Sequence, residues 1–434
     1  MQYSKQDRSG FRSAEPFLNS RAGAAFALAA LMVSACLTVD FADGNGYIDL
    51  LVYRMGAHVL LDGGDIYGAL PPVFGNFALP FTYPPLSAML FVPLELIPLG
   101  LGKLMFTLVS VAGLGVTLRV VLDRVRPHLG ARVSWTATAI ALAAALQLEP
   151  VRETISFGQI NLVLMALVAV DVLTKGPKWP RGLLIGLAAA IKLTPIGFLL
   201  LFLLKRDWRT SGHIVGAAFG FTALAFVVMP ESSAKYWLQT LSDTGRIGPA
   251  YFANNESIKA VISRFGPPAQ FGSVLWLVAV VVMLVVAVTA IRRALDHADL
   301  VSALIANATA VLLASPVSWS HHWVWAAPAL LVLTLGALRA PRERTVVAAT
   351  GIGALFLIGP QHLLPTAGDR ELDWALWQHL LGTLYVTVGF GFLLWLAFVR
   401  YRTRAGVVEA QVRESASSER TVSPHDSPST SPMV

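Results

Sequence analysis

Apolar segments long enough to cross a lipid bilayer recur along the whole chain. The first covers residues 22–39 and the last covers residues 379–399. A transmembrane helix needs about 20 mainly apolar residues, and in lipid it must satisfy its own backbone hydrogen bonds. Of the 434 residues, 55% are hydrophobic and only 14% are charged, whereas a soluble domain carries about 25% charged residues. The sequence therefore predicts an all-α polytopic membrane protein.

The net charge of +7 comes from basic residues gathered in the loops between these segments. Basic loops are typical of the cytoplasmic side of membrane proteins, so this charge does not indicate nucleic acid as a partner. The single cysteine, Cys36, excludes an intramolecular disulfide framework.

The distribution of Lys and Arg sets the predicted topology. Residues 1–21 form a basic segment that belongs in the cytoplasm, so residues 22–39 cross outward. Residues 84–98 are a short apolar run broken by two prolines, which suits a helix lying at the membrane interface. If this run crossed, the next helix would carry four arginines to the outer side: Arg119, Arg124, Arg126 and Arg132. Residues 40–101 are therefore predicted to form one large external loop.

Residues 182–204 are apolar, but basic residues flank both ends, so a single crossing would violate the charge rule. A hairpin of two short half-helices that turns near Lys192 satisfies the rule. The transmembrane domain, residues 22–400, then has about 12 crossings, a second long external loop at residues 230–270, and both termini in the cytoplasm. The Ser- and Pro-rich tail, residues 401–434, is predicted to be disordered. The crossings are residues 22–39, 104–122, 133–148, 158–174, the hairpin in 182–204, 211–229, 271–291, 300–314, 322–338, 345–359 and 379–399.

Polar residues collect near the outer face of this predicted topology. Ionisable groups close to hydrocarbon are costly, and they commonly mark functional sites. The set comprises Asp43, Asp49, Glu149, Arg152, Glu153, Gln159, Asn161, Lys192, Asn254, Asn255, Glu256, His321 and His322. A carboxylate base and groups that could hold a phosphate would therefore face one cavity.

Several of these residues also have ordinary structural explanations. Asp49 could cap a helix, Lys192 could extend its ammonium group outward to the interface, and Arg152 could pair with its neighbouring glutamates. The adjacent His321 and His322 could belong to an interfacial belt beside tryptophans. Neighbouring positions on a helix point apart, and no third ligand stands at metal-binding spacing, so we expect no metal site from this pair.

Seven blocks of the sequence, taken in order, resemble glycosyltransferase family 87 over residues 22–400. This family includes the actinobacterial polyprenyl-phosphate-mannose-dependent α-(1→2)-mannosyltransferases. The blocks are Asp49–Gly56, Asp65–Tyr67, Tyr83–Leu86, Phe157–Leu162, Ala190–Pro195, Asn254–Ser257 and Ser315–His322.

The resemblance implies a GT-C enzyme, a helical bundle with juxtamembrane helices in its first external loop. Such an enzyme would lie in the plasma membrane among membrane lipids, with its active site on the extracytoplasmic side. It would move mannose from polyprenyl-phosphate-mannose to a mannose hydroxyl of a phosphatidylinositol mannoside, lipomannan or lipoarabinomannan. By motif position, Asp49 would be the catalytic aspartate, and Lys192, His321 and His322 would be candidates for the donor phosphate. The further candidates for substrate binding are Tyr53, Arg54, Tyr83, Gln159, Asn161, Asn254, Asn255 and Glu256.

The chemistry of this reaction is consistent with one carboxylate. A single inverting displacement needs one base for the acceptor hydroxyl, and a β-linked mannosyl phosphate would then give an α-linked product. A retaining double displacement would need a second carboxylate at a defined distance, and the sequence offers no compelling pair. We expect no cofactor and no required metal, because no diphosphate clamp of the Asp-x-Asp type stands out.

Two alternatives remain at the level of the sequence. One is an arabinofuranosyltransferase that uses decaprenyl-phosphate-arabinose, and the other is a polytopic glycolipid transporter or flippase. Transporters usually place polar residues near the bilayer midplane and often contain internal repeats. Here the polar residues collect near one face and no repeat is evident, which favours an enzyme.

Overall fold

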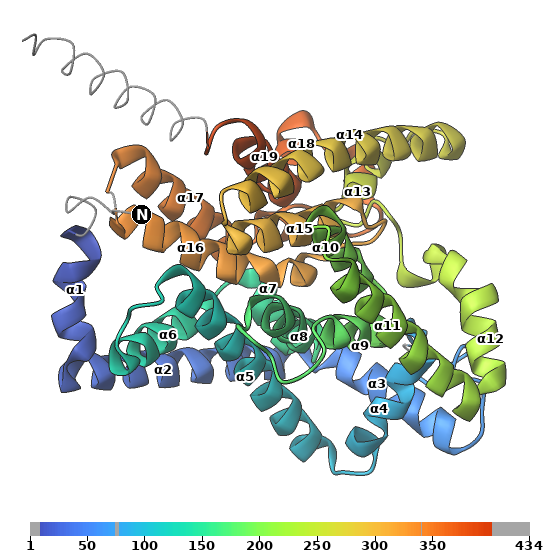
Figure 1. The fold of residues 1–434 in the computed structure, drawn as a ribbon. Helices are drawn as coiled ribbons and strands as arrows, with labels where there is room; N and C mark the ends of the chain where they lie inside the picture. Colours follow the sequence, from blue (N-terminus) through green and yellow to red (C-terminus); the bar gives the residue numbers. More distant parts are fainter. Residues whose placement is uncertain (1–8, 74–77, 340, 402–434) are drawn as a thin grey trace, which may run out of the picture.

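The computed structural model describes residues 9–73, 78–339 and 341–401 (Figure 1). Within these ranges the regular secondary structure is helical and no strand forms, which confirms the all-α prediction. The predicted tail falls outside the described residues, apart from Tyr401 at its start.

Five helical segments are long and apolar enough to cross a membrane, as expected of an integral membrane protein. A sixth is added if a pair of helices with a 75° bend between them forms one span. The five are α2 (Arg21–Asn45), α5 (Leu99–Val125), α11 (Trp208–Val228), α14 (Ala269–Asp296) and the segment Ser320–Arg339, and the bent pair is α6 (Ala131–Leu146) with α7 (Glu149–Ser156).

The described residues therefore contain fewer span-length helices than the 12 crossings expected from the sequence. The other apolar segments do form helices, but these have about 10–17 residues, which is short for a straight span. They include α4 (Pro85–Glu95), α8 (Asn161–Leu173), α15 (Leu300–Ala314), α17 (Glu343–Ile358) and α19 (Leu384–Phe398). Shorter elements are α1 (Ser9–Asn19), α12 (Pro230–Leu238), α13 (Ile258–Ser263) and α18 (Leu376–Leu381).

The end of α2 turns sharply into α3 (Ile48–Leu61). Gly46 adopts φ +79°, a left-handed conformation that glycine adopts without steric cost, and its N–H donates to the carbonyl of Ala42. Helix α3 then starts against the end of α7, where the Asp49 N–H donates to the carbonyl of Phe157 at 2.8 Å. This docking fixes the position of the first turn of α3.

Helices α3 and α4 pack on each other as two short helices of the first predicted external loop. Tyr53 of α3 stacks on Phe91 of α4 with ring centroids 4.2 Å apart. Arg54 donates to the carbonyls of Leu94 and Ile97 at the end of α4. With 11 residues, α4 is too short to span a membrane, as expected for residues 84–98.

The segment between α9 (Leu183–Ile191) and α10 (Leu199–Leu204) reverses the chain direction. The backbone leaves the helical conformation at Lys192, which has φ −144° and ψ 127°. Helix α11 then runs in the same direction as α9, so the residues between them must return to the level at which α9 began.

Close packing of glycines establishes that parallel arrangement. Gly182 lies against Thr210 at the start of α11, and Gly186 lies against Ala217 one to two turns further on. A Cβ atom on Gly186 would stand only 2.5 Å from the Cβ of Ala217. The glycine allows the two backbones to approach, and the turn at Lys192 agrees with the expected hairpin.

Candidate functional site

Asp49 occupies the first turn of α3, and it is held near Gln159 and Lys192. Desolvation by the surrounding protein raises the pKa of Asp49 to about 6, although the hydrogen bond from Gln159 and the charge of Lys192 oppose this rise. A carboxyl group in this state is ionised near neutral pH and is basic enough to accept a proton.

Two buried tyrosines surround the amide of Gln159. The hydroxyl of Tyr83 lies 2.7 Å from Oε1 of Gln159, and the hydroxyl of Tyr53 lies 3.0 Å from the same atom. The two hydroxyl oxygens are 2.8 Å apart. The predicted site residues Tyr53, Tyr83 and Gln159 therefore meet beside Asp49, although the two tyrosines lie 106 and 76 positions away from Gln159.

Lys192 joins the other predicted polar residues. Its Nζ donates to Oδ1 of Asn161 at 2.9 Å and lies 3.2 Å from Nε2 of His322. An ammonium group has only donors, so Nε2 of His322 accepts and its Nδ1 carries the hydrogen of a neutral imidazole. The Nζ also stands 5.3 Å from the ring centroid of Tyr83, in cation–π range.

His321 and His322 point to different surroundings. The carbonyl of His321 accepts hydrogen bonds from Thr154 at 2.6 Å and from Asn161 at 3.1 Å. Its ring packs edge-on against Phe157, with centroids 5.1 Å apart. Of the two rings, that of His322 lines the cavity described next, which separates two residues that the sequence could not distinguish.

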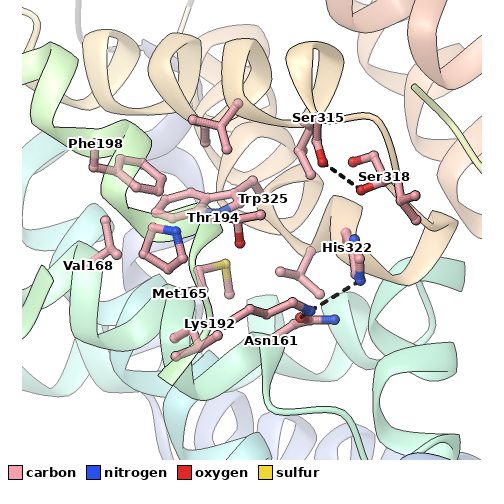
Figure 2. Close-up of a pocket in the computed structure, with 17 residues that line it drawn as sticks. Asn161, Met165, Val168, Lys192, Thr194, Phe198, Ser315, Ser318, His322 and Trp325 are labelled. Atoms are coloured by element: carbon pink, nitrogen blue, oxygen red, sulfur yellow. Dashed lines mark hydrogen bonds between the residues drawn. The ribbon is translucent and has the colours of Figure 1, made fainter. Parts of the chain in front are cut away.

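A cavity of about 60 Å³ opens beside Lys192 (Figure 2). Lys192, Asn161 and His322 form its polar end, and Ser315 and Ser318 lie nearby (Figure 2). The opposite end is apolar and is lined by Met165, Val168, Phe198 and Trp325, among others. A ligand with an anionic head and a hydrocarbon chain matches this division.

Three of the eleven predicted substrate-binding residues line this cavity, and Asp49 lies outside its lining. The eight that do not line it are Tyr53, Arg54, Tyr83, Gln159, Asn254, Asn255, Glu256 and His321. The guanidinium of Arg54 is used at the C-terminal end of α4, where the unpaired carbonyls of a helix need donors. It also pairs with Glu95 at 3.4 Å. Arg54 therefore holds α3 and α4 together, and the structure gives it a scaffolding position.

Asn254 and Asn255 support the cavity wall from outside. Oδ1 of Asn255 accepts from the N–H of Ser318 at 2.9 Å, and the carbonyl of Asn254 accepts from the N–H of Ser320 at 2.7 Å. Because Ser318 lines the cavity, these bonds fix its shape without contact to a ligand.

Arg264, which the sequence did not single out, organises the loop that carries these asparagines. It is fully buried and donates to five carbonyls, those of Tyr251, Phe252, Ala253, Asn255 and Gly382. Glu256 lies close to it; burial raises the pKa of Glu256 to about 8, and the charge of Arg264 counters that rise. A lone arginine in a long loop offers no sequence pattern that would have revealed this role.

Glu149 is fully buried and belongs to a separate network. It accepts hydrogen bonds from Tyr385 at 2.7 Å, His362 at 2.7 Å and Gln361 at 3.2 Å. Its ion-pair partner is thus His362, and Arg152 lies instead over the ring of Phe41 at 4.8 Å. Desolvation alone would lower the pKa of His362, but the hydrogen bond and charge of Glu149 raise it.

Glu149, Glu153 and His362 could also hold a metal ion by geometry, since one ligand atom from each lies within 4.8 Å of the others. Hydrogen bonds already occupy both carboxylate oxygens of Glu149, and His362 supplies the positive charge at this place. The sequence did not anticipate this group, because His362 is more than 200 residues away from Glu149.

Helices long and apolar enough to cross a membrane, packed around a cavity with one cationic end, define an integral membrane protein with a polar site. The chain belongs to glycosyltransferase family 87, whose family model matches residues 81–316. It is therefore a membrane glycosyltransferase, and the expected family is confirmed.

Curated relatives cover most of the chain. One from Mycolicibacterium smegmatis is 40% identical over 381 residues, which cover 83% of this chain and 86% of the relative. One from Mycobacterium tuberculosis is 36% identical over 356 residues, covering 78% and 82%. Both are named polyprenol-phosphate-mannose-dependent alpha-(1-2)-phosphatidylinositol mannoside mannosyltransferase.

A third relative, also from Mycolicibacterium smegmatis, is 33% identical over 365 residues, covering 82% of this chain and 87% of its own. It is named polyprenol-phosphate-mannose-dependent alpha-(1-2)-phosphatidylinositol pentamannoside mannosyltransferase. No solved structure matches the chain significantly.

Proposed function

We propose that this enzyme transfers mannose from polyprenyl-phosphate-mannose to a mannose hydroxyl of a phosphatidylinositol mannoside, forming an α-1,2 linkage. The names of the relatives support the donor and the acceptor. The observation that carries the proposal is the cavity, because its polar end holds Lys192 and His322 while its other walls are apolar.

The donor phosphate would bind at the polar end of the cavity. The ammonium of Lys192 supplies charge-assisted hydrogen bonds, and it is already oriented by Asn161 and His322. These fixed donors stabilise the negative charge that grows on the phosphate as it leaves. The polyprenyl chain would lie along the apolar walls near Phe198 and Trp325.

Asp49 acts as the general base in this reaction. The acceptor hydroxyl gives its proton to the Asp49 carboxylate while its oxygen forms a bond to C1 of mannose. The bond between C1 and the phosphate oxygen breaks, and its electron pair leaves with polyprenyl phosphate. One displacement inverts C1, so a β-linked donor gives an α-linked product. No metal or cofactor enters any of these steps.

We also propose a GT-C arrangement of about 12 crossings, with the active site on the extracytoplasmic face and both termini in the cytoplasm. The hairpin at Lys192 supports it, because the reversal returns the chain to the basic side. His213 of α11 contacts the carbonyl of Arg181 at 3.0 Å, so the two ends of the hairpin lie together.

The test of the reaction is a transfer assay with the purified enzyme in lipid vesicles. Radiolabelled polyprenyl-phosphate-mannose and decaprenyl-phosphate-arabinose are offered in turn, with a phosphatidylinositol mannoside or a long lipomannan as acceptor. We expect mannose to appear in the phosphatidylinositol mannoside, with or without EDTA. Transfer of arabinose alone, or movement of glycolipid between leaflets without transfer, would contradict the proposal.

A further inference from the structure

The hydroxyl groups of Tyr53 and Tyr83 and Oε1 of Gln159 form a closed triangle. Its sides measure 2.7, 2.8 and 3.0 Å, all within hydrogen-bonding distance. All three side chains are at least nine-tenths buried. Buried polar atoms that lie this close together must share hydrogens in a defined way.

The supply of hydrogens decides the orientation of the amide. Burial raises the pKa of Tyr53 and of Tyr83, so both phenols keep their hydrogens. Tyr83 donates to Oε1 of Gln159, and Tyr53 shares its hydrogen between Tyr83 and the same Oε1. A flipped amide would turn its NH2 group away from Asp49 and set its carbonyl against a carboxylate.

We propose that Gln159, Tyr53 and Tyr83 are positioning residues that hold the Asp49 carboxylate in the orientation needed to accept a proton. The amide NH2 of Gln159 donates to Asp49, and the two phenols lock that amide. This inference rests on the proposed function, and it assigns to three expected substrate-binding residues a role that acts through Asp49.

The hydrogen bond from Gln159 has a consequence for the titration of Asp49. It stabilises the ionised carboxylate, so its loss raises the pKa of Asp49 and moves the acid limb of the rate profile to higher pH. Asp49 also faces the charge of Lys192. The phenols of Tyr53 and Tyr83 face it too, and His322 stands behind Lys192. The remaining charged groups nearby have other partners: Lys103 lies over Tyr47, Glu95 pairs with Arg54, and Glu153 of α7 accepts from Ser156.

The experiment measures initial transfer rates against pH for the full-length enzyme and for Gln159→Leu, Tyr53→Phe and Tyr83→Phe. We expect Gln159→Leu to move the acid limb of the rate profile to higher pH by about one unit. A pKa shift of that size corresponds to the loss of about one hydrogen bond to a charged group. The two tyrosine variants should shift it in the same direction by less. The KM for the donor should stay within about twofold in Tyr83→Phe, because the phenyl ring under Lys192 remains.

A double-mutant cycle separates positioning from general loss of packing. Removing either tyrosine hydroxyl in the Gln159→Leu background should move the acid limb no further, because the amide that the phenols orient is gone. Tyr385→Phe is the matched control; it removes a buried phenol that donates to Glu149, and it should leave the acid limb in place.

The outcomes are distinguishable. An unchanged acid limb in Gln159→Leu, in an enzyme that still transfers mannose, would overturn the positioning role and leave the proposed function standing. A shift of equal size in Tyr385→Phe would also overturn the role, since the effect would then follow any loss of a buried phenol. Failure of the wild-type enzyme to transfer at any pH would overturn both.

Discussion

Lys192 is placed at the polar end of the cavity by a break in the helix. The backbone at Lys192 is extended, and this releases its side chain toward Asn161 and His322. An ammonium group held by a neutral imidazole and an amide is a fixed hydrogen-bond donor, and such donors stabilise negative charge. At the scale of single residues, the proposed site consists of this cation and the Asp49 carboxylate, which it also faces.

Lys192→Ala should weaken use of the lipid-phosphate donor. Removal of one partner from a buried charge interaction costs at least about 2 kcal/mol, or roughly 30-fold in kcat/KM for the donor. The KM for the acceptor should change much less. The matched control is Lys235→Ala, which removes a partly exposed lysine paired with Asp65. Equal losses in the two variants would argue against a donor site at Lys192.

The pH dependence of transfer should report Asp49. Its pKa is raised to about 6, so the carboxylate is present above that pH and is lost as the pH falls through it. A base that carries a proton cannot accept another, so the rate should fall about tenfold for each unit below pH 6. Initial rates measured from about pH 4.5 to about pH 8, a range that brackets this pKa, test the prediction. A rate that rises on acidification would contradict the role of Asp49 as a base.

Among the elements, the loop between α12 and α14 depends on Arg264 for its shape. Backbone carbonyls of four loop residues converge on one buried guanidinium, and Gly382 brings the segment after α18 to the same point. The hydrogen bond from the N–H of Ser318 to Oδ1 of Asn255 then connects this loop to the cavity wall. The loop between α12 and α14 thus supports the polar end of the cavity, although Asn255 and Arg264 do not line the cavity themselves.

Arg264→Met should destabilise the protein strongly, because several buried carbonyls lose their donor. Each unsatisfied buried group costs about 1–3 kcal/mol, so we expect a loss of at least about 3 kcal/mol. The thermal unfolding midpoint of the detergent-solubilised protein measures it. Arg370→Met serves as control, because Arg370 is exposed. A midpoint for Arg264→Met that matches this control would show that the loop holds without its arginine.

The sequence predicted the helices better than the side-chain contacts between them. The apolar segments gave the helices, and the basic flanks of residues 182–204 predicted the reversal at Lys192, because both patterns are local. The partners of Gln159 and Glu149 come from distant parts of the chain, and no local pattern encodes them. The contacts of Arg54 with the end of α4 are also made across the chain, and no local pattern encodes them either.

For the whole molecule, the proposed topology places the first loop and the basic loops on opposite sides of the membrane. Leu96, at the end of α4, and Trp208, at the start of α11, are both well exposed, with 71% and 67% of their surface accessible. In a Cys36→Ser background, a cysteine in place of Leu96 should react with a membrane-impermeant reagent in whole cells. A cysteine in place of Trp208 should react only after the cells are opened.

The reverse labelling pattern would invert the proposed sidedness. Reaction of both cysteines in intact cells would mean that the segments between them do not cross as proposed. In either case the contacts within the cavity would stand, since they depend on the fold and not on its orientation in the bilayer.

Mannose transfer by Asp49→Asn, measured beside the wild type, decides whether Asp49 is the base. The substitution keeps the size of the side chain and removes its basicity, so folding should be retained and transfer should fall by at least about a hundredfold. Asp65→Asn is the matched control, an exposed aspartate of the same loop that pairs with Lys235. Loss of transfer in Asp49→Asn alone is the predicted result; near-normal turnover by Asp49→Asn would contradict it.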